Sequence, residues 1–284
     1  MPETIKNFIV KNYIYLIVSI FYFVFAWRFS GFSLLGLAVL LNFYVLSLVL
    51  ALSPAGEIVL RAVSGIRPLE TKREKEYLLP IFEEVYAQAK EYYPILSEKI
   101  EMCIIDTMTI NACAIGTKTV AVTKGAINTL SAEELKGIIA HEMGHIARGH
   151  TKLILLVTLG NGMFTIFALL YRLFATALEI AGHSTKNEFI AFVVSLFRFI
   201  VQVCLLVFIW LIEVALAVNS RANEYEADKF AYETGLGQNL IDSLYVLQDI
   251  TLTERVRISQ KLIESHPHIA KRIGTLEKMV DSER

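Results

Sequence analysis

Long uncharged, apolar stretches alternate along the chain with segments whose hydrophobic residues recur at helical or strand spacing. Sixteen uncharged residues separate Lys11 from Arg28, and twenty-eight separate Arg28 from Glu57. Because about 20 apolar residues span a bilayer as a helix, residues 9–29 and 32–53 are predicted to form a transmembrane hairpin. No small-residue cleavage site follows the first stretch, so it is expected to stay in place as an anchor.

Two further apolar stretches predict a second hairpin, at residues 152–178 and 189–218. The first contains nineteen uncharged residues in a row, with a Gly-Asn-Gly sequence in its middle that weakens a helix. The other contains Arg198 and Glu213 with fourteen uncharged residues between them, and we expect both charges to lie at the edges of the membrane. The alternative is that this hairpin enters the membrane or packs on the first hairpin without crossing.

Between the hairpins, residues 57–150 have the charged, amphipathic composition of a soluble domain. Thr71 and Glu74 form a capping-box pattern that predicts a helix through Tyr92, which Pro80 should kink or restart. The basic residues at the start of this segment are expected to face lipid headgroups: Arg61, Arg67, Lys72 and Arg73.

Three short segments rich in β-forming residues predict strands at 100–106, 110–115 and 119–123. If they pair in sequence order, 110–115 lies in the centre of the sheet and has no free edge. A second capping box, Ser131 with Glu134, is followed by apolar residues at helical spacing and predicts a helix from about residue 132. A small sheet therefore precedes the helix that carries most of the candidate chemistry.

That helix contains an H-E-x-x-H sequence, in which His141 and His145 lie one turn apart and Glu142 points between them. Neutral imidazoles at this spacing can bind zinc, and the carboxylate can act as a base toward water. A catalytic zinc site needs a third protein ligand and an open position. Glu224 is the candidate ligand, because it shares a helix face with Asp228, which could orient a ligand histidine through its free ring N–H.

The pairing of H-E-x-x-H with a later E-x-x-x-D resembles the HtpX and CAAX-prenyl-protease group of membrane zinc peptidases. The resemblance extends over residues 10–280 and includes the order of further segments. These are residues 111–116 and 120–125 before the motif helix, and His266 and Pro267 followed by Arg272 and Ile273 after it. The resemblance implies a mainly α protein with a four-helix transmembrane region, a zincin-like α+β catalytic domain with a small sheet, and one Zn²⁺ per chain.

The resemblance also implies roles for individual residues. One segment is similar to the family's substrate strand, whose backbone pairs with an extended peptide: Asn111, Ala112, Cys113 and Ala114. Cys113 stands where an aromatic residue is often found. His266 and Arg272 would approach the metal cleft, where one of them, or Tyr225, could donate a hydrogen bond to the tetrahedral intermediate. Alternatively, they only fix a C-terminal helix, which is predicted at 268–280.

Composition and charge exclude other classes of function. With 55% hydrophobic residues and a mean hydropathy of +0.51, the chain is too apolar for an ordinary soluble domain. A net charge of −1, without a basic stripe interleaved with aromatics, excludes nucleic acid as a partner. The cysteines have no C-x-x-C spacing, so we interpret them as buried apolar residues of a reducing compartment. His150 does not fit the spacing of a third histidine ligand and is expected at the membrane interface.

These observations predict a multi-pass protein of the inner (plasma) membrane that begins with a hairpin at residues 1–56. Basic residues near the span ends place residues 57–150, residues 219–284 and both termini in the cytoplasm, with residues 151–218 joining the halves of one catalytic domain. The predicted activity is that of a zinc metalloendopeptidase, with Glu142 as base, which cleaves membrane-associated or misfolded proteins in quality control. The alternatives are a protease of prenylated CAAX peptides and a non-catalytic zinc-binding membrane scaffold.

Overall fold

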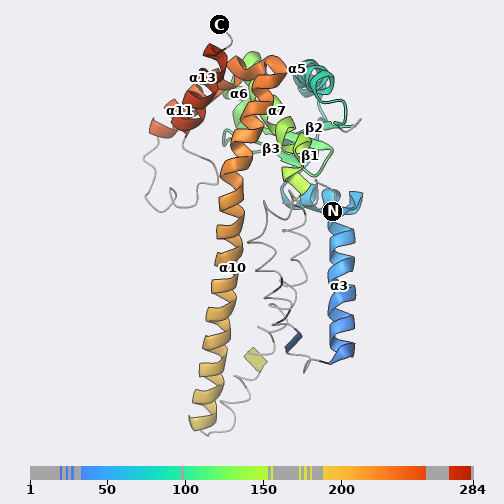
Figure 1. Ribbon diagram of the computed structural model, residues 1–284, viewed down its shortest axis with the longest axis vertical. Coiled ribbons are helices and arrows are strands. Elements are labelled where there is room, and N and C mark those ends of the chain that lie inside the picture. Colours follow the sequence, from blue (N-terminus) through green and yellow to red (C-terminus); the bar gives the residue numbers. More distant parts are fainter. Residues whose placement is uncertain are drawn as a thin grey trace. The chain divides into compact units, whose positions relative to one another are not determined.

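The structure is a computed structural model that describes residues 20, 24, 27–28, 33–96, 99–152, 155, 173, 176–177, 180, 188–253 and 269–282. This part of the chain is mainly helical and contains one small sheet (Figure 1), as predicted. It divides into two compact units, one formed by residues 1–50 with 158–219 and the other by 51–157 with 220–284. The predicted spans 9–29 and 152–178 lie almost wholly outside the described residues.

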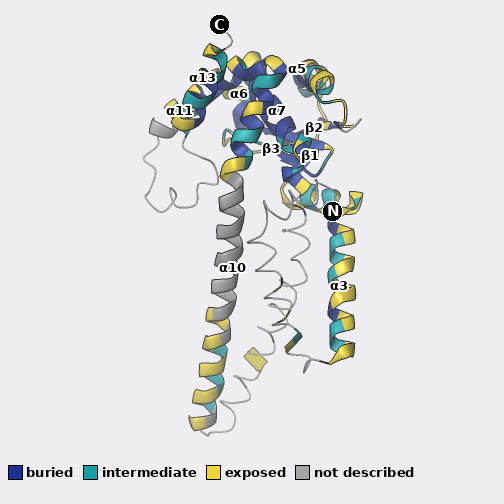
Figure 2. Cartoon of the chain, viewed as in Figure 1, coloured by how far each residue is buried: buried dark blue, intermediate teal, exposed yellow. Residues whose placement is uncertain are grey.

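Helix α3 (Leu34–Leu52) corresponds to the predicted span 32–53. Its most apolar window has a mean hydropathy of 2.4 and is only 11% buried, and exposed residues occur along its whole length (Figure 2). Among the described residues it is the one helix that is long and apolar enough to cross a membrane. The layout of four spans and its orientation stay predictions.

Helix α10 (Glu188–Ala231) is continuous over 44 residues. It contains the predicted fourth apolar segment, 189–218, and continues without a break through Glu224 and Asp228. The apolar segment and the segment that carries Glu224 and Asp228 therefore belong to one helix. A π-helical turn, η1 (Tyr232–Leu236), follows before α11 (Gly237–Thr253) begins.

Four strands form a mixed sheet with the order β1-β2-β4-β3. β2 and β4 are parallel, whereas β1 with β2 and β3 with β4 form antiparallel pairs. The strands are β1 (Ile66–Pro68), β2 (Glu101–Ile105), β3 (Ala112–Ile115) and β4 (Thr119–Thr123). The three predicted strands are confirmed, but pairing in sequence order is wrong. Among the described residues, β4 lies between β2 and β3 and leaves β3 at an edge of the sheet.

A tight turn joins β3 to β4, and Gly116 adopts a φ of 61° in it. A Cβ atom at Gly116 would lie 2.2 Å from Glu57 Oε2. Glu57 comes from helix α4 (Pro54–Val63), and its carboxylate accepts hydrogen bonds from Thr117 N (3.2 Å) and Thr119 Oγ1 (2.5 Å). The glycine therefore makes the turn and also admits the carboxylate that ties α4 to the sheet.

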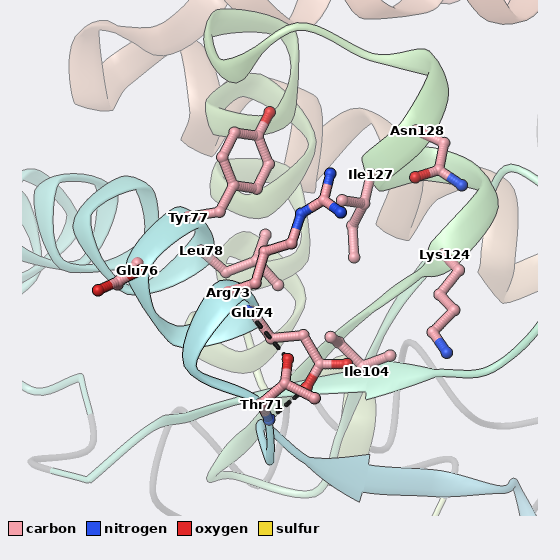
Figure 3. A pocket seen from close by; sticks show the side chains of 10 residues that line it. All are labelled: Thr71, Arg73, Glu74, Glu76, Tyr77, Leu78, Ile104, Lys124, Ile127 and Asn128. Atoms are coloured by element: carbon pink, nitrogen blue, oxygen red, sulfur yellow. Dashed lines mark hydrogen bonds between the residues drawn. The ribbon is translucent and has the colours of Figure 1, made fainter.

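Helix α5 (Lys72–Tyr92) begins with the predicted capping box, in which the side chains of Thr71 and Glu74 each accept a hydrogen bond from the other's backbone N–H (Figure 3). The helix continues through Pro80, so the predicted restart is wrong. The reason is an apolar face that is buried on both sides of the proline: Leu78, Ile81, Phe82, Val85 and Ala89. Burial of this face outweighs the backbone hydrogen bond that the proline removes.

Arg61 and Arg67 pair with carboxylates of the protein itself. Arg67 donates to Glu74 Oε1 (2.7 Å) and Asp106 Oδ2 (2.7 Å), and Arg61 donates to Glu101 Oε2 (2.7 Å). Hydrogen bonds, first of all from Arg67, lower the pKa of Glu74 to about 2. Each of these two arginines is therefore held by an acidic residue of its own unit, and the expectation that they face lipid headgroups stays a prediction.

Helix α7 (Ala132–Ala147) lies at the centre of the core. Ser131 and Glu134 form the predicted capping box, and the helix begins at the predicted residue. A Cβ atom at Gly137 would lie 2.3 Å from Leu240 N, so α7 and α11 meet backbone to backbone at this glycine. Helix α6 (Lys124–Thr129) precedes α7, and α13 (Ile269–Asp281), which packs on α11, corresponds to the predicted C-terminal helix.

Candidate metal centre

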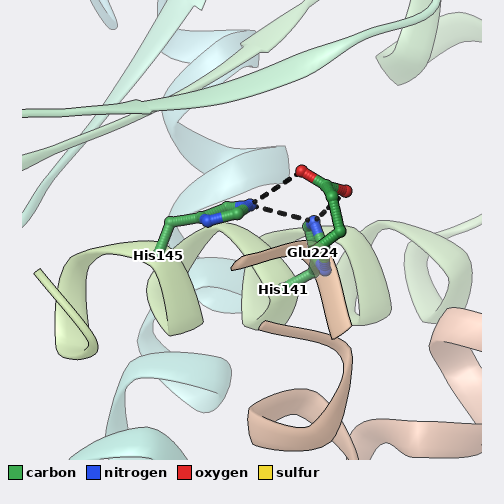
Figure 4. A group of neighbouring side chains, drawn as sticks. All are labelled: His141, His145 and Glu224. Atoms are coloured by element: carbon green, nitrogen blue, oxygen red, sulfur yellow. Dashed lines mark hydrogen bonds and ion pairs between the residues drawn. The ribbon is translucent and has the colours of Figure 1, made fainter. Parts of the chain in front are cut away.

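Three side chains from two helices meet over α7 (Figure 4). His141 Nε2 lies 3.2 Å from His145 Nε2. The carboxylate of Glu224, on α10, approaches both nitrogens: Oε2 lies 3.5 Å from His141 Nε2, and Oε1 lies 3.4 Å from His145 Nε2. His141 and Glu224 are 5% and 3% exposed. The fold thus brings the H-E-x-x-H histidines and the predicted third ligand to one buried point.

The donor atoms fit a tetrahedral zinc ion. Zinc binds histidine nitrogen and carboxylate oxygen at about 2.0–2.2 Å, which places neighbouring donors of a tetrahedron about 3.3–3.6 Å apart. The observed separations of 3.2, 3.4 and 3.5 Å lie close to this range. Two imidazoles and one carboxylate leave one tetrahedral position open, which is the arrangement of catalytic zinc sites and not of closed structural ones.

Asp228 and Arg272 form a buried ion pair behind His141. Asp228 Oδ1 lies 2.8 Å from His141 Nδ1. Arg272 donates to both oxygens of that carboxylate, from Nε (2.9 Å) and from Nη2 (2.6 Å), and its Nη1 lies 3.2 Å from Glu224 Oε2. A hydrogen bond from His141 Nδ1–H to Asp228 leaves the Nε2 lone pair free for a metal, and Arg272 holds Asp228 in place.

Two carboxylates beside His141 oppose the effect of its burial on its pKa. Burial and the nearby Arg272 lower the pKa of His141, but hydrogen bonds with Asp228 and Glu224 outweigh both and raise it to about 9. Burial raises the pKa of Asp228, and hydrogen bonds with His141 and Arg272 reverse this and lower it. Asp228 is therefore an anion at neutral pH, and a metal that binds His141 must displace a proton.

Arg272 lies close to the candidate metal ligands, as the family resemblance implies, and is 6% exposed. Its Nε and Nη2 are both occupied by Asp228, so the contacts present are those of a residue that orients ligands. A donor role toward the substrate stays a prediction. His266, the other predicted donor, lies outside the described residues. The predicted site residues that the structure brings together are His141, Glu142, His145, Glu224, Asp228 and Arg272.

His150 forms a second chain of contacts, behind His145. Its Nδ1 lies 3.0 Å from His145 Nδ1, and its Nε2 lies 3.1 Å from Glu226 Oε2. His150 is 8% exposed, so the prediction that it lies at the membrane interface is wrong. Gly149, with a φ of 75°, follows the end of α7 and turns the chain so that His150 meets the preceding helical turn.

Both contacts of His150 can be hydrogen bonds at the same time for one choice of tautomers of His145 and His150. A His145 that binds a metal through Nε2 carries its proton on Nδ1 and donates it to His150 Nδ1. His150 then carries its own proton on Nε2 and donates it to Glu226. Sequence reasoning missed both His150 and Glu226. The available signal was the glycine before His150, which is the usual residue where a helix ends and the chain turns back.

Strand β3 lies beside the candidate base. The strand packs against α7, the helix that carries Glu142. Burial, and then the negative charge of Glu142, raise the pKa of Cys113 to about 12. One edge of β3 pairs with β4, and no other described strand pairs with the opposite edge. Asn111 precedes the strand, and its backbone N–H donates to Thr123 Oγ1 (3.0 Å). An unpaired strand edge beside the base is what pairing with an extended peptide requires.

The known proteins to which this chain is similar are named as proteases or peptidases. The model of peptidase family M48 matches residues 72–280. A protease HtpX homolog of Bacteroides fragilis is 29% identical over 247 residues, which cover 78% of this chain and 73% of that protein. A protease HtpX of Actinobacillus pleuropneumoniae is 28% identical over 200 residues, 63% of this chain and 66% of that protein. A CAAX prenyl protease 1 homolog of Caenorhabditis elegans is 26% identical over 148 residues, 51% of this chain and 32% of that protein.

Among solved structures, the crystal structure of S. mikatae Ste24p aligns with 96% of this chain and 65% of its own, with a TM-score of 0.47 and 19% sequence identity. The matches span between 32% and 73% of the length of the relatives named above. The family match covers more than half of the chain and includes the H-E-x-x-H helix, Glu224 and Asp228. With these residues in place, the chain belongs to peptidase family M48.

Proposed function

We propose that this protein is a zinc metalloendopeptidase that hydrolyses peptide bonds without a covalent intermediate. The observation that carries the proposal is the convergence of His141, His145 and Glu224 at separations typical of zinc ligands, with Glu142 beside them on α7. Zinc bound there supplies Lewis-acid chemistry, because it acidifies water and polarises a carbonyl oxygen. Membership of peptidase family M48 supports a protease.

Glu142 acts as the base and then as the acid. It takes a proton from the water that attacks the peptide carbonyl carbon, and it delivers this proton to the amide nitrogen as the C–N bond breaks. At 9% exposure its carboxylate is largely shielded from bulk water. A closed structural zinc site needs no unligated carboxylate beside an open position, so Glu142 favours catalysis over a scaffold role.

The substrates that we propose are extended segments of membrane-associated or misfolded proteins, cleaved at the cytoplasmic face of the inner membrane in protein quality control. Backbone pairing along the free edge of β3 would hold such segments with little preference for side chains. The apolar helix α3 and the HtpX relatives support a membrane location. Residues Asn111–Ala114 are the proposed binding strand, since they lie at or next to this edge.

Replacing Glu142 by glutamine tests the proposed mechanism. The variant should lose about 10²–10⁴-fold in the rate of peptide hydrolysis, because general acid–base transfer is removed, while elemental analysis still finds one zinc per chain. Glu83→Gln, at an exposed position of α5, is the matched control and should retain wild-type activity. Hydrolysis at the wild-type rate by purified Glu142→Gln protein would refute the assignment.

The zinc-binding scaffold is tested by the same preparation. Zinc-replete wild-type protein that digests neither casein nor an unfolded membrane protein would favour the scaffold over the protease. Glu224→Ala separates the two parts of the assignment, because loss of its zinc without loss of folding shows that Glu224 is a ligand whatever the activity.

A CAAX-type prenyl-peptide protease is the second candidate. The similarity to the Caenorhabditis elegans CAAX prenyl protease 1 homolog favours it. The test is a comparison of kcat/KM for one peptide sequence with and without a C-terminal prenyl-cysteine. A strong preference for the prenylated form would establish this candidate, and equal rates would reject it.

A further inference from the structure

Helix α4 turns its apolar side outward and its polar side toward the protein. Its exposed residues follow one stripe at helical spacing, and every one of them is apolar: Pro54, Ala55, Ile58, Val59, Ala62 and Val63. Within this apolar stripe, Ile58 is 63% and Val63 is 80% exposed. A surface helix of a soluble protein has the opposite arrangement, with its apolar side in the core.

The polar residues of α4 fix this orientation. Glu57 accepts hydrogen bonds from Thr117 N and Thr119 Oγ1 at the β3–β4 turn. Arg61, one turn later, donates to Glu101 Oε2 on β2. Because both contacts are made by the side of α4 that faces the sheet, the apolar stripe cannot turn inward unless they break.

The chain connects this stripe directly to an apolar helix. α3 ends at Leu52 and α4 begins at Pro54, so Ser53 alone separates them. Ser53 caps α4 by accepting a hydrogen bond from Gly56 N. Two residues of extended chain cover at most about 7 Å, so the first turn of α4 stays close to the end of α3.

A hollow of about 350 Å³ borders the apolar stripe, and its wall includes Pro54 and two exposed lysines. Lys118 belongs to the β3–β4 turn, and Lys152 follows α7. The same wall holds two carboxylates and a third cation, Arg61. Glu57 accepts hydrogen bonds from the turn, and Glu101 forms an ion pair with Arg61, so the cations outnumber the carboxylates. The lysines therefore offer positive charge next to an apolar surface.

We propose that α4 lies in the membrane interface, with its apolar stripe among the acyl chains and with Lys118 and Lys152 bound to the headgroup phosphate of an anionic phospholipid. A lipid is the occupant because the stripe continues an apolar helix and because apolar surface and positive charge lie side by side, as in helices that bind bilayer surfaces. The proposal rests on the membrane location proposed above but not on proteolysis. Its tests therefore use no peptidase assay.

A spin label on α4 tests the depth of the helix. The full-length protein would carry the changes Cys103→Ser, Cys113→Ala and Cys204→Ala and be reconstituted in phosphatidylcholine–phosphatidylglycerol vesicles. A label at Val59→Cys should be relaxed more strongly by oxygen, which concentrates among acyl chains, than by a water-soluble nickel chelate. A label at Glu76→Cys, whose native side chain is 67% exposed on α5, should show the reverse.

Ala62→Cys, one turn further along the stripe, is a second label position in case Val59→Cys does not fold. The zinc content of each variant shows whether it has folded. Nickel access at the stripe equal to that at Glu76→Cys would overturn the proposal. A label that is immobile and reached by neither reagent would also overturn it, since protein would then cover the stripe. Dipolar broadening between labels would indicate a second copy of the chain and have the same consequence.

The lysines predict a preference for anionic lipid. Near a negative surface each lysine raises affinity about fivefold, so Lys118→Gln with Lys152→Gln should weaken phosphatidylglycerol binding by about 25-fold. The measurement is the concentration of phosphatidylglycerol in mixed micelles at which the Tm of each protein rises. Lys75→Gln with Lys271→Gln, two exposed lysines elsewhere, should leave it unchanged. Equal effects in both double variants, no effect in the first, or the same Tm rise with inorganic phosphate would overturn the headgroup contact.

Discussion

Replacing Gly144 by alanine tests how closely α10 must approach α7 for the metal site to form. A Cβ atom at Gly144 would lie 3.0 Å from both Ala227 Cα and Phe230 Cβ and 3.1 Å from Ala227 O. Carbon atoms pack without repulsion from about 3.5 Å, so α10 must move away by about 0.5 Å. Ala227 and Glu224 lie about one turn apart on α10, so the third ligand moves with the helix.

This displacement is large on the scale of zinc coordination, in which distances are kept within about 0.2 Å. We expect Gly144→Ala to weaken zinc binding by about 10- to 100-fold, which is the usual effect of changing the residues that position a metal ligand. Overpacking should also lower the free energy of unfolding of the metal-free protein by about 1–3 kcal/mol. Competition with a chromophoric chelator measures the first effect, and unfolding in excess EDTA measures the second.

Gly274→Ala is the matched control, because a Cβ atom at this position of α13 meets nothing within 4 Å. This variant should keep wild-type zinc affinity and unfold at the same or a slightly higher temperature, since alanine favours a helix over glycine. If Gly144→Ala bound zinc as tightly as the wild type, the argument that this glycine sets the position of the third ligand would be refuted.

Three other changes probe the surroundings of the site and of the sheet. Asp228→Asn should weaken zinc binding by about 10- to 100-fold in the same competition, and unchanged affinity would contradict its orienting role. His150→Ala should weaken binding by about tenfold and shift the visible bands of the cobalt-substituted protein, whereas Lys271→Ala should change neither. The pKa of Glu74 is lowered from 4.5 to about 2, so its stabilisation is complete above 4.5 and is lost as the pH falls toward 2. Arg67→Gln should therefore reduce the fall in Tm between about pH 5 and pH 3, and an unreduced fall would contradict this.

Local sequence signals predicted where helices begin but not how strands pair. A capping box needs only residues three apart, so Thr71 and Ser131 marked the starts of α5 and α7 correctly. Strand order depends on contacts between distant segments, and β2 pairs in parallel with β4 instead of with the next strand along the chain. β1 has three residues, of which Ile66 is buried, and this is too short to show a strand pattern.

The candidate ligands were predictable from fixed spacings on single helices. His141 and His145 stand four residues apart on α7, and Glu224 and Asp228 stand four residues apart on α10. The residues that support them come from elsewhere. His150 meets His145 because the chain turns at Gly149, and Glu226 reaches His150 from 76 positions further along the chain. No local pattern relates residues so far apart, so this contact is visible only once α10 packs against α7.

The buried ion pair behind His141 also determines when the candidate metal site can form during synthesis. Arg272 lies 131 positions after His141 and 44 after Asp228. At about 5–20 residues per second, it leaves the ribosome roughly 7–26 s after that histidine. A nascent chain that stops short of Arg272 lacks the guanidinium that donates to both oxygens of Asp228, which then keeps, among the described residues, only its contact with His141. Loss of one partner from a buried ion pair strongly destabilises the packed state. Translation must therefore pass Arg272 before the candidate metal site can take the form seen in the structure.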